Sequence, residues 1–97
     1  MIEEKLASLD ISLPIPPEPV GSYLPVVISG NLAFVAGQIP IEGNAAKFKG
    51  KVESIVLGQE AARLCTLNAL AQLKSSLGTL DRIKRVIKVT GFVNCDP

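Results

Sequence analysis

The sequence predicts an α+β fold in which helices pack on one face of a β-sheet. Two apolar runs, 26–28 and 32–36, flank a turn, a helical pattern covers 57–77, and apolar and polar residues alternate over 82–94. A hairpin followed by a strand–helix–strand unit is typical of the α+β class. A length of 97 residues suits one small domain.

Composition and charge exclude several classes of protein. Apolar residues make up 47% and charged residues 20% of the chain, which is a globular balance. A net charge of +1 provides no field that would attract nucleic acid or an anionic membrane. No apolar run approaches the roughly 20 residues of a membrane span, and the acidic N-terminus is unlike a signal peptide. We therefore expect a cytoplasmic protein with neither a membrane nor a nucleic-acid partner.

Histidine is absent from the sequence. Its absence removes Ser–His and Cys–His catalysis and the commonest metal ligand. Cys65 and Cys95 lie too far apart for a CxxC motif and have no histidine with which to complete a zinc site. We expect two reduced thiols, no metal site and no cofactor.

The first 25 residues form an N-terminal helix and a strap. Ile2, Leu6 and Leu9 have helical spacing, which predicts a short helix. The strap that follows has proline at positions 14, 16, 17, 19 and 25. Proline at this density excludes a helix or a central strand and favours an extended segment. Because the strap ends in Val20 and Tyr23, we expect it to lie on the body of the domain.

A β-hairpin is predicted where Ser29, Gly30 and Asn31 separate the two apolar runs. Gly and Asn accept the positive φ angles of tight hairpin turns. The polar segment 41–54 is predicted to be a loop with a short strand near 47–51.

The helix predicted over 57–77 ends at Gly78, a residue suited to helix termination. Asn68 lies at the centre of its apolar arc, where a buried amide requires hydrogen-bond partners. Asn68 either fixes a neighbouring loop through backbone groups or contacts a ligand directly. Cys65, one turn earlier, is expected to be a small core residue.

Residues 82–94 are predicted to form a half-buried strand, because apolar and polar side chains alternate along them. Arg82, Lys84 and Lys88 form a basic row. The row is either a solvated strand face or a surface for anions or RNA. Aromatic residues do not alternate with these charges, as they would in a single-strand binder.

Three segments together resemble one known family. They are FVAGQIP (34–40) after the Gly-Asn turn, GQEAARLCTLNALAQLKSSLG (58–78) and LDRIKRVIKVTGFVN (80–94). Nearly the whole chain resembles the RidA family, also called the YjgF or endoribonuclease L-PSP family, in its longer and less characterised branch. The resemblance implies a chorismate-mutase-like fold and a homotrimer with ligand clefts between subunits. It also implies hydrolysis of enamines and imines, such as 2-aminoacrylate, to a keto acid and ammonia.

The resemblance also implies which residues form the ligand site. Tyr23 would line the cleft, the N–H of Gly37 would meet a small-molecule carboxylate, and Gln38 belongs to the same motif. Ala36 stands where the deaminase branch often has serine. From the residues alone, a bulge that bends the strand is an equally good reason for Gly37.

The family places an arginine for the substrate carboxylate and a water-activating glutamate on strands that would follow residue 97. We therefore expect a truncated single domain, with 1–25 as helix and strap and 26–97 as core, whose sheet is incomplete. Its catalytic residues stay unidentified, and we expect the chain alone to be inactive. A genuine short protein that covers its open edge by oligomerisation is the alternative.

Three functions remain open. Enamine or imine deamination follows from the resemblance, and a non-enzymatic ligand-binding or protein-interaction module of the same fold is the alternative. Ribonuclease or translation-inhibitor activity, described for some family members, is disfavoured by the lack of histidine and of a strongly basic face.

Overall fold

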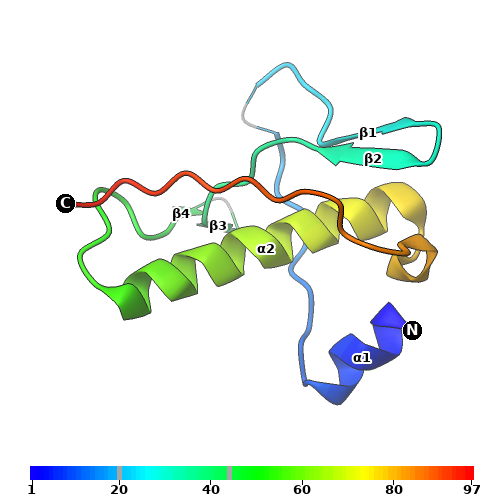
Figure 1. Ribbon diagram of the computed structural model, residues 1–97, viewed down its shortest axis with the longest axis horizontal. Helices are drawn as coiled ribbons and strands as arrows, with labels where there is room; N and C mark the ends of the chain where they lie inside the picture. The colour runs from blue at the N-terminus through cyan, green and yellow to red at the C-terminus, as the bar shows by residue number, and fades with distance from the viewer. Residues whose placement is uncertain (20, 44) are drawn as a thin grey trace.

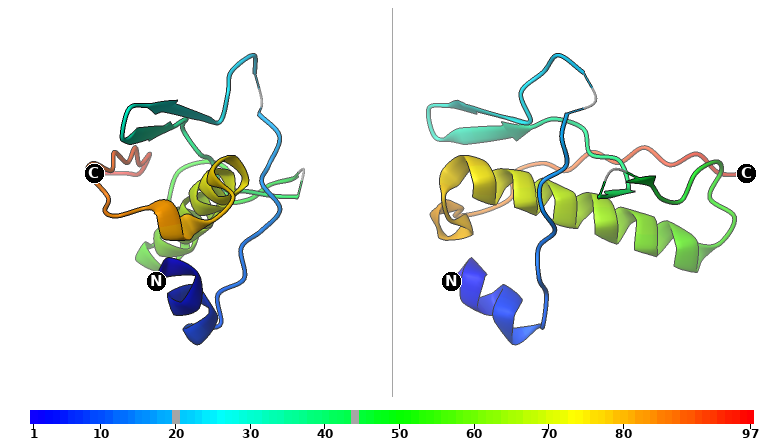
Figure 2. Two further views of the ribbon diagram at one scale, coloured as in Figure 1. Left: turned by 90° about the vertical axis from the view of Figure 1, so that its right-hand side faces the viewer. Right: turned by 180° about the vertical axis from the view of Figure 1, so that it is seen from behind.

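A computed structural model describes residues 1–19, 21–43 and 45–97 of the chain, and confirms the α+β class. Its centre is one long helix, α2 (Ile55–Leu77). The hairpin of β1 (Val26–Ser29) and β2 (Leu32–Val35) lies on one side of α2, and the short helix α1 (Ile2–Ser8) lies on the other (Figures 1 and 2). The packing expected of Val20 lies outside the described residues.

Helix α2 begins two residues earlier than predicted because Ser54 caps it. The Ser54 hydroxyl oxygen accepts a hydrogen bond from the Leu57 N–H at 3.1 Å, satisfying one of the free donors of the first turn. The predicted end at Gly78 is confirmed. Gly78 has a φ of 84°, a conformation that glycine adopts without a steric penalty, and its N–H donates to the Lys74 carbonyl at 2.8 Å.

The predicted hairpin is confirmed. Strands β1 and β2 are antiparallel, with Val26 opposite Val35 and Ser29 opposite Leu32. Gly30, the first central residue of the turn, has a φ of 57°, a positive value that glycine adopts at this position of hairpin turns.

The strand predicted near 47–51 is wrong, and a smaller hairpin forms just before it. Strand β3 (Ile41–Glu42) pairs antiparallel with β4 (Ala45–Ala46). Phe48 and Gly50 have φ angles of 54° and 88°. These left-handed conformations interrupt an extended backbone, so no strand can run through 47–51.

The strand predicted over 82–94 is also wrong. Leu80–Arg82 forms a 3-10 turn, η1, and the chain then runs extended alongside α2 (Figure 1). Among the described residues it meets other extended chain only near its end, where Val52 bridges to Cys95 and the Val52 N–H donates to the Asn94 carbonyl at 2.7 Å. Alternation identified an extended backbone, but a strand also needs a neighbour to supply its hydrogen bonds.

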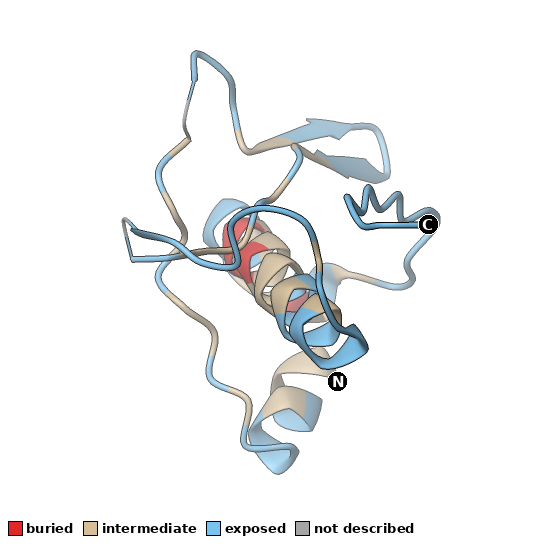
Figure 3. Cartoon of the chain, turned by 90° about the vertical axis from the view of Figure 1, so that its left-hand side faces the viewer, coloured by how far each residue is buried: buried red, intermediate tan, exposed pale blue. Residues whose placement is uncertain are grey.

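The interior of the described chain is small and lies along α2 (Figure 3). Its buried apolar residues are Ala71 and Leu80, and its buried polar residues are Asn68 and Gln72. Many large apolar side chains of the hairpin and of the 83–94 segment remain exposed. The two buried amides on α2 therefore account for much of what holds the surrounding segments in place.

Candidate functional site

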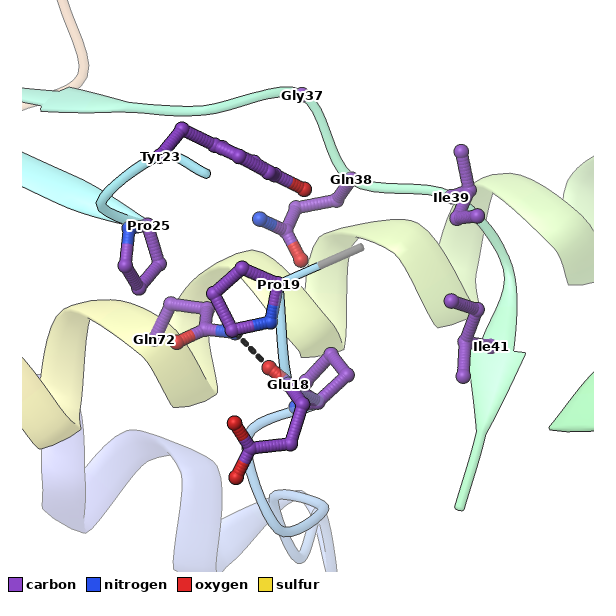
Figure 4. Close-up of a pocket in the computed structure, with 10 residues that line it drawn as sticks. Glu18, Pro19, Tyr23, Pro25, Gly37, Gln38, Ile39, Ile41 and Gln72 are labelled. Atoms are coloured by element: carbon purple, nitrogen blue, oxygen red, sulfur yellow. Dashed lines mark hydrogen bonds between the residues drawn. The ribbon is translucent and has the colours of Figure 1, made fainter. Parts of the chain in front are cut away.

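A pocket lies where the proline-rich strap and the segment after β2 meet over α2 (Figure 4). The strap contributes one wall, the 37–41 segment the opposite wall, and α2 the floor. The lining residues are Pro17, Glu18, Pro19, Tyr23, Pro25, Gly37, Gln38, Ile39, Ile41 and Gln72. Gln72 of α2 is the buried residue of this lining. The two walls therefore depend on contacts with that helix for their positions.

The three residues that the resemblance assigned to a ligand, Tyr23, Gly37 and Gln38, lie together in this pocket. The hydroxyl of Tyr23 points toward Gln38 (Figure 4). The Gln38 side-chain Nε2 donates to the Ala36 carbonyl at 3.2 Å, which fixes the bend of the chain after β2. Their role in contacting a ligand stays a prediction.

Gly37 is a glycine that the described chain itself does not require. Its φ is outside the positive range found at four other glycines. A Cβ built on Gly37 would meet no described atom within 4 Å. The space beside its α-carbon is therefore open, and close approach of another group is a physical reason for glycine there.

Asn68 fixes the 39–41 wall, as one of the two interpretations of the sequence predicted. Its Nδ2 donates to the Ile41 carbonyl at 2.8 Å and to the Ile39 carbonyl at 3.3 Å. The two carbonyls define the amide orientation, because the reversed amide would place oxygen against oxygen. The Oδ1 atom is buried and has no hydrogen-bond partner among the described residues.

Gln72 fixes the strap wall, and sequence reasoning did not find it. Its Nε2 donates to the Pro17 carbonyl at 2.7 Å, and its side chain lines the pocket. Gln72 lies four residues after Asn68, so the two amides share one face of α2. That spacing of a second amide behind the first was the signal that could have identified it.

The closed pocket is small for a substrate. Its cavity volume is about 20 Å³, which is room for about one ordered water. Small-molecule sites usually enclose about 300–1,000 Å³. A metabolite could therefore occupy the site only if the strap moved or if further groups extended the pocket outward.

The lining is apolar apart from the amides, the Tyr23 hydroxyl and Glu18. The Glu18 carboxylate points away from Gly37 and Gln38 (Figure 4). An anionic ligand beside Gly37 would therefore meet backbone and amide groups rather than a facing carboxylate.

Both cysteines are free thiols, as predicted. Cys65 is half-buried in α2, and burial raises the pKa of its thiol, whereas Cys95 is exposed. In the described part of the chain, no cluster of three or more metal-ligating side chains occurs. No helix within residues 1–19, 21–43 and 45–97 is long and apolar enough to cross a membrane, and the cytoplasmic address stays a prediction.

The described chain is an α+β fold built on one long helix, with a small pocket beside that helix. The sequence model described as "YjgF/chorismate_mutase-like, putative endoribonuclease" matches residues 3–97. The chain belongs to this family, which confirms the resemblance inferred from its motifs.

Three relatives illustrate the match. "Protein TCP17" of Trypanosoma cruzi is 37% identical over 99 residues, which cover 99% of this chain and 62% of that protein. The crystal structure of "a putative endoribonuclease" from Shewanella oneidensis is 34% identical, with a TM-score of 0.80 over 87% of this chain and 58% of that one. A protein "with unknown function" from Agrobacterium tumefaciens, Atu1372, is 41% identical, with a TM-score of 0.74 over 89% of this chain and 54% of its own. The chain thus spans between half and two thirds of the length of these relatives.

Proposed function

We propose that this chain supplies one part of a binding cleft for a small carboxylate, of the kind that family enzymes use to hydrolyse enamines and imines such as 2-aminoacrylate. The observation that carries the proposal is the open face of Gly37 beside Tyr23 and Gln38 in one pocket. A backbone N–H aimed at an anion is a common recognition device. The small volume of the closed pocket agrees with a cleft that a neighbouring subunit of a homotrimer completes.

Two lining features favour ligand recognition over catalysis by this chain alone. The N–H of Gly37 has no acceptor among the described residues, so it is available to a ligand. The groups around it are amides, a phenol and prolines, whereas hydrolysis of an imine needs a polarised water with a proton donor beside it. Binding without turnover, as in a non-enzymatic ligand-binding module, is therefore our alternative for the isolated chain.

Endoribonuclease activity is a second candidate, suggested by the names of the family model and of the Shewanella protein. The pocket favours a small ligand over RNA. The described lining is apolar and rich in proline and contains neither lysine nor arginine, the side chains that contact a phosphate backbone.

Pyruvate, the keto acid formed from 2-aminoacrylate, is a stable probe of the site. We expect titration of the ¹⁵N-labelled chain with pyruvate to shift the amide resonances of Tyr23, Gly37 and Gln38 with a Kd of about 1 mM or weaker. Acetone keeps the carbonyl and lacks the carboxylate, so it should leave these resonances in place. In parallel, we expect the chain not to accelerate ammonia release from 2-aminoacrylate generated by a dehydratase.

Gly37→Ala is the sharpest variant for this proposal. The added methyl group has free space in the chain, so the free energy of unfolding should stay the same or rise by up to about 1 kcal/mol. The affinity for pyruvate, measured from the amide shifts, should fall several-fold. Unchanged pyruvate binding in Gly37→Ala would contradict the proposed contact between Gly37 and the ligand. A marked loss of stability would instead support the bulge as the reason for glycine. Cleavage of RNA by the purified chain, without pyruvate binding, would favour the ribonuclease candidate.

A further inference from the structure

We propose that Gln72 is a specificity-determining positioning residue, which sets the width of the pocket and so the size of the 2-oxo acid that fits it. The inference rests on the proposed function, because it concerns the ligand of the same site.

The two amides hold opposite walls of the pocket from one rigid element. Asn68 holds the wall at residues 39–41 through two carbonyl groups, and Gln72 holds the strap through the Pro17 carbonyl at 2.7 Å. Both side chains are buried, at 1% and 6% exposure. Residues four apart lie about one helical turn from each other, so α2 fixes the distance between the walls.

The two attachments are unequal. The 39–41 wall is also held by the β3–β4 pairing and by the bond from the Lys47 N–H to the Pro40 carbonyl at 2.7 Å. On the strap side, the Ala36 N–H holds the Pro25 carbonyl at 2.9 Å, and Gln72 holds the Pro17 carbonyl at the other end of the wall. Displacement of the strap around Pro17 is therefore the less costly way to widen the pocket, and Gln72 controls it.

The strap also carries the aromatic residue of the site. Tyr23 stands six residues after Pro17, on the same wall. While Gln72 holds Pro17, the pocket leaves about 20 Å³. A released Pro17 would draw that part of the wall away from Tyr23, which would admit a larger side chain and expose the Tyr23 ring.

The test compares two 2-oxo acids that share a head group and differ in bulk, pyruvate and phenylpyruvate. Gln72→Met keeps the length of the side chain and removes its N–H donors. We expect the ratio of the Kd for phenylpyruvate to the Kd for pyruvate to fall by roughly threefold to tenfold in this variant, about the effect of one hydrogen bond. Gln59→Met, at an exposed position of the same helix, is the matched control and should keep the wild-type ratio.

A second readout follows the strap without any ligand. Tyr23 is the single tyrosine of a chain that has no tryptophan, so the intrinsic emission reports on this residue alone. Acrylamide quenching of Tyr23 should increase in Gln72→Met, toward the value of the unfolded chain, and stay unchanged in Gln59→Met. Pro16→Gly loosens the strap without altering α2, and it replaces Gln72→Met in the test if that variant does not fold. It should lower the Kd ratio and increase the quenching of Tyr23, as expected for Gln72→Met.

The outcomes separate this inference from the proposed function. If the Kd values of both acids rise by the same factor in Gln72→Met, Gln72 is a structural residue only. The inference is then wrong, while the proposed function stands. If the wild-type chain binds neither acid, the proposed function fails and the inference fails with it. Unchanged Tyr23 quenching in both Gln72→Met and Pro16→Gly would show that Gln72 does not hold the strap.

Discussion

Glu3 shows how one side chain can join distant parts of a short sequence. Its carboxylate accepts hydrogen bonds from the Leu80 N–H at 2.9 Å and the Thr79 hydroxyl at 3.3 Å, and pairs with Lys74 at 3.1 Å. Its own N–H donates to the Asp81 carboxylate at 2.9 Å. Helix α1 is thus fastened to the end of α2 by polar contacts that span more than 70 residues of sequence. Amphipathic spacing predicted the helix, but no local pattern indicates such a distant partner.

The Glu3 contacts should make the docking of α1 sensitive to acid. The Leu80 N–H, followed by Lys74, lowers the pKa of the Glu3 carboxyl from its ordinary value of 4.5. The folded state therefore favours the ionised form, so the stabilisation is present above the ordinary pKa and is lost as pH falls through the lowered pKa. We expect the Leu80 amide resonance to titrate with a midpoint below 4.5 by NMR.

Two variants separate Glu3 from its neighbour in the same helix. The titration of the Leu80 amide should disappear in Glu3→Gln, which keeps the shape of the side chain and removes the charge. It should persist in Glu4→Gln, because Glu4 is exposed. A midpoint at or above the ordinary glutamate pKa would contradict the role of Glu3 in docking α1.

Whole elements were predictable where their signals are local. The hairpin turn, the termination of α2 at Gly78 and the short α1 all follow from residues within a few positions of the feature. The strand predicted over 82–94 failed for the opposite reason, because its existence depends on hydrogen bonds from another segment. The place of Gln72 behind Asn68 on α2 is a local signal, but its partner Pro17 is 55 residues away and no local pattern predicts that contact.

Asn68 shows how one helix fixes a separate β-hairpin, and Asn68→Ala tests it. The substitution removes both donors to the Ile39 and Ile41 carbonyls and leaves a small cavity. We expect a loss of about 1–3 kcal/mol in the free energy of unfolding, measured by urea denaturation. Hydrogen exchange at the Lys47 amide should accelerate more than exchange within the β1–β2 ladder, because only β3 is attached through Asn68.

Thr66→Ala is the matched control for Asn68→Ala. The Thr66 hydroxyl donates within α2 to the Ala62 carbonyl at 2.8 Å and is exposed, so its loss should change stability by less than about 0.5 kcal/mol. Equal losses in the two variants would mean that Asn68 contributes only to helix stability. Faster exchange in the β1–β2 ladder than at Lys47 would also contradict its role in holding β3.

The molecule as a whole exposes much of the apolar surface that its composition predicted to be core. Val86, Val89 and Phe92 are 74%, 83% and 94% exposed on the 83–94 segment. Val27, Leu32 and Phe34 of the hairpin are also exposed. Composition gives the amount of apolar surface, whereas burial depends on what lies opposite each side chain, and that information is not local. Exposed large apolar side chains in this number are typical of a surface that contacts other chains, and they support our proposal of a homotrimer.

Association of the chain with copies of itself is therefore our last prediction. Sedimentation velocity should show a species of three times the monomer mass that becomes more abundant with concentration. Phe92→Lys should shift the population toward monomer with little change in the monomer's own stability, because the Phe92 side chain has almost no contact within the chain to lose. Thr66→Lys adds the same charge at an exposed position of α2 and should leave the population unchanged. A chain that stays monomeric at every concentration, or equal effects of the two substitutions, would show that the 83–94 segment does not form the contact.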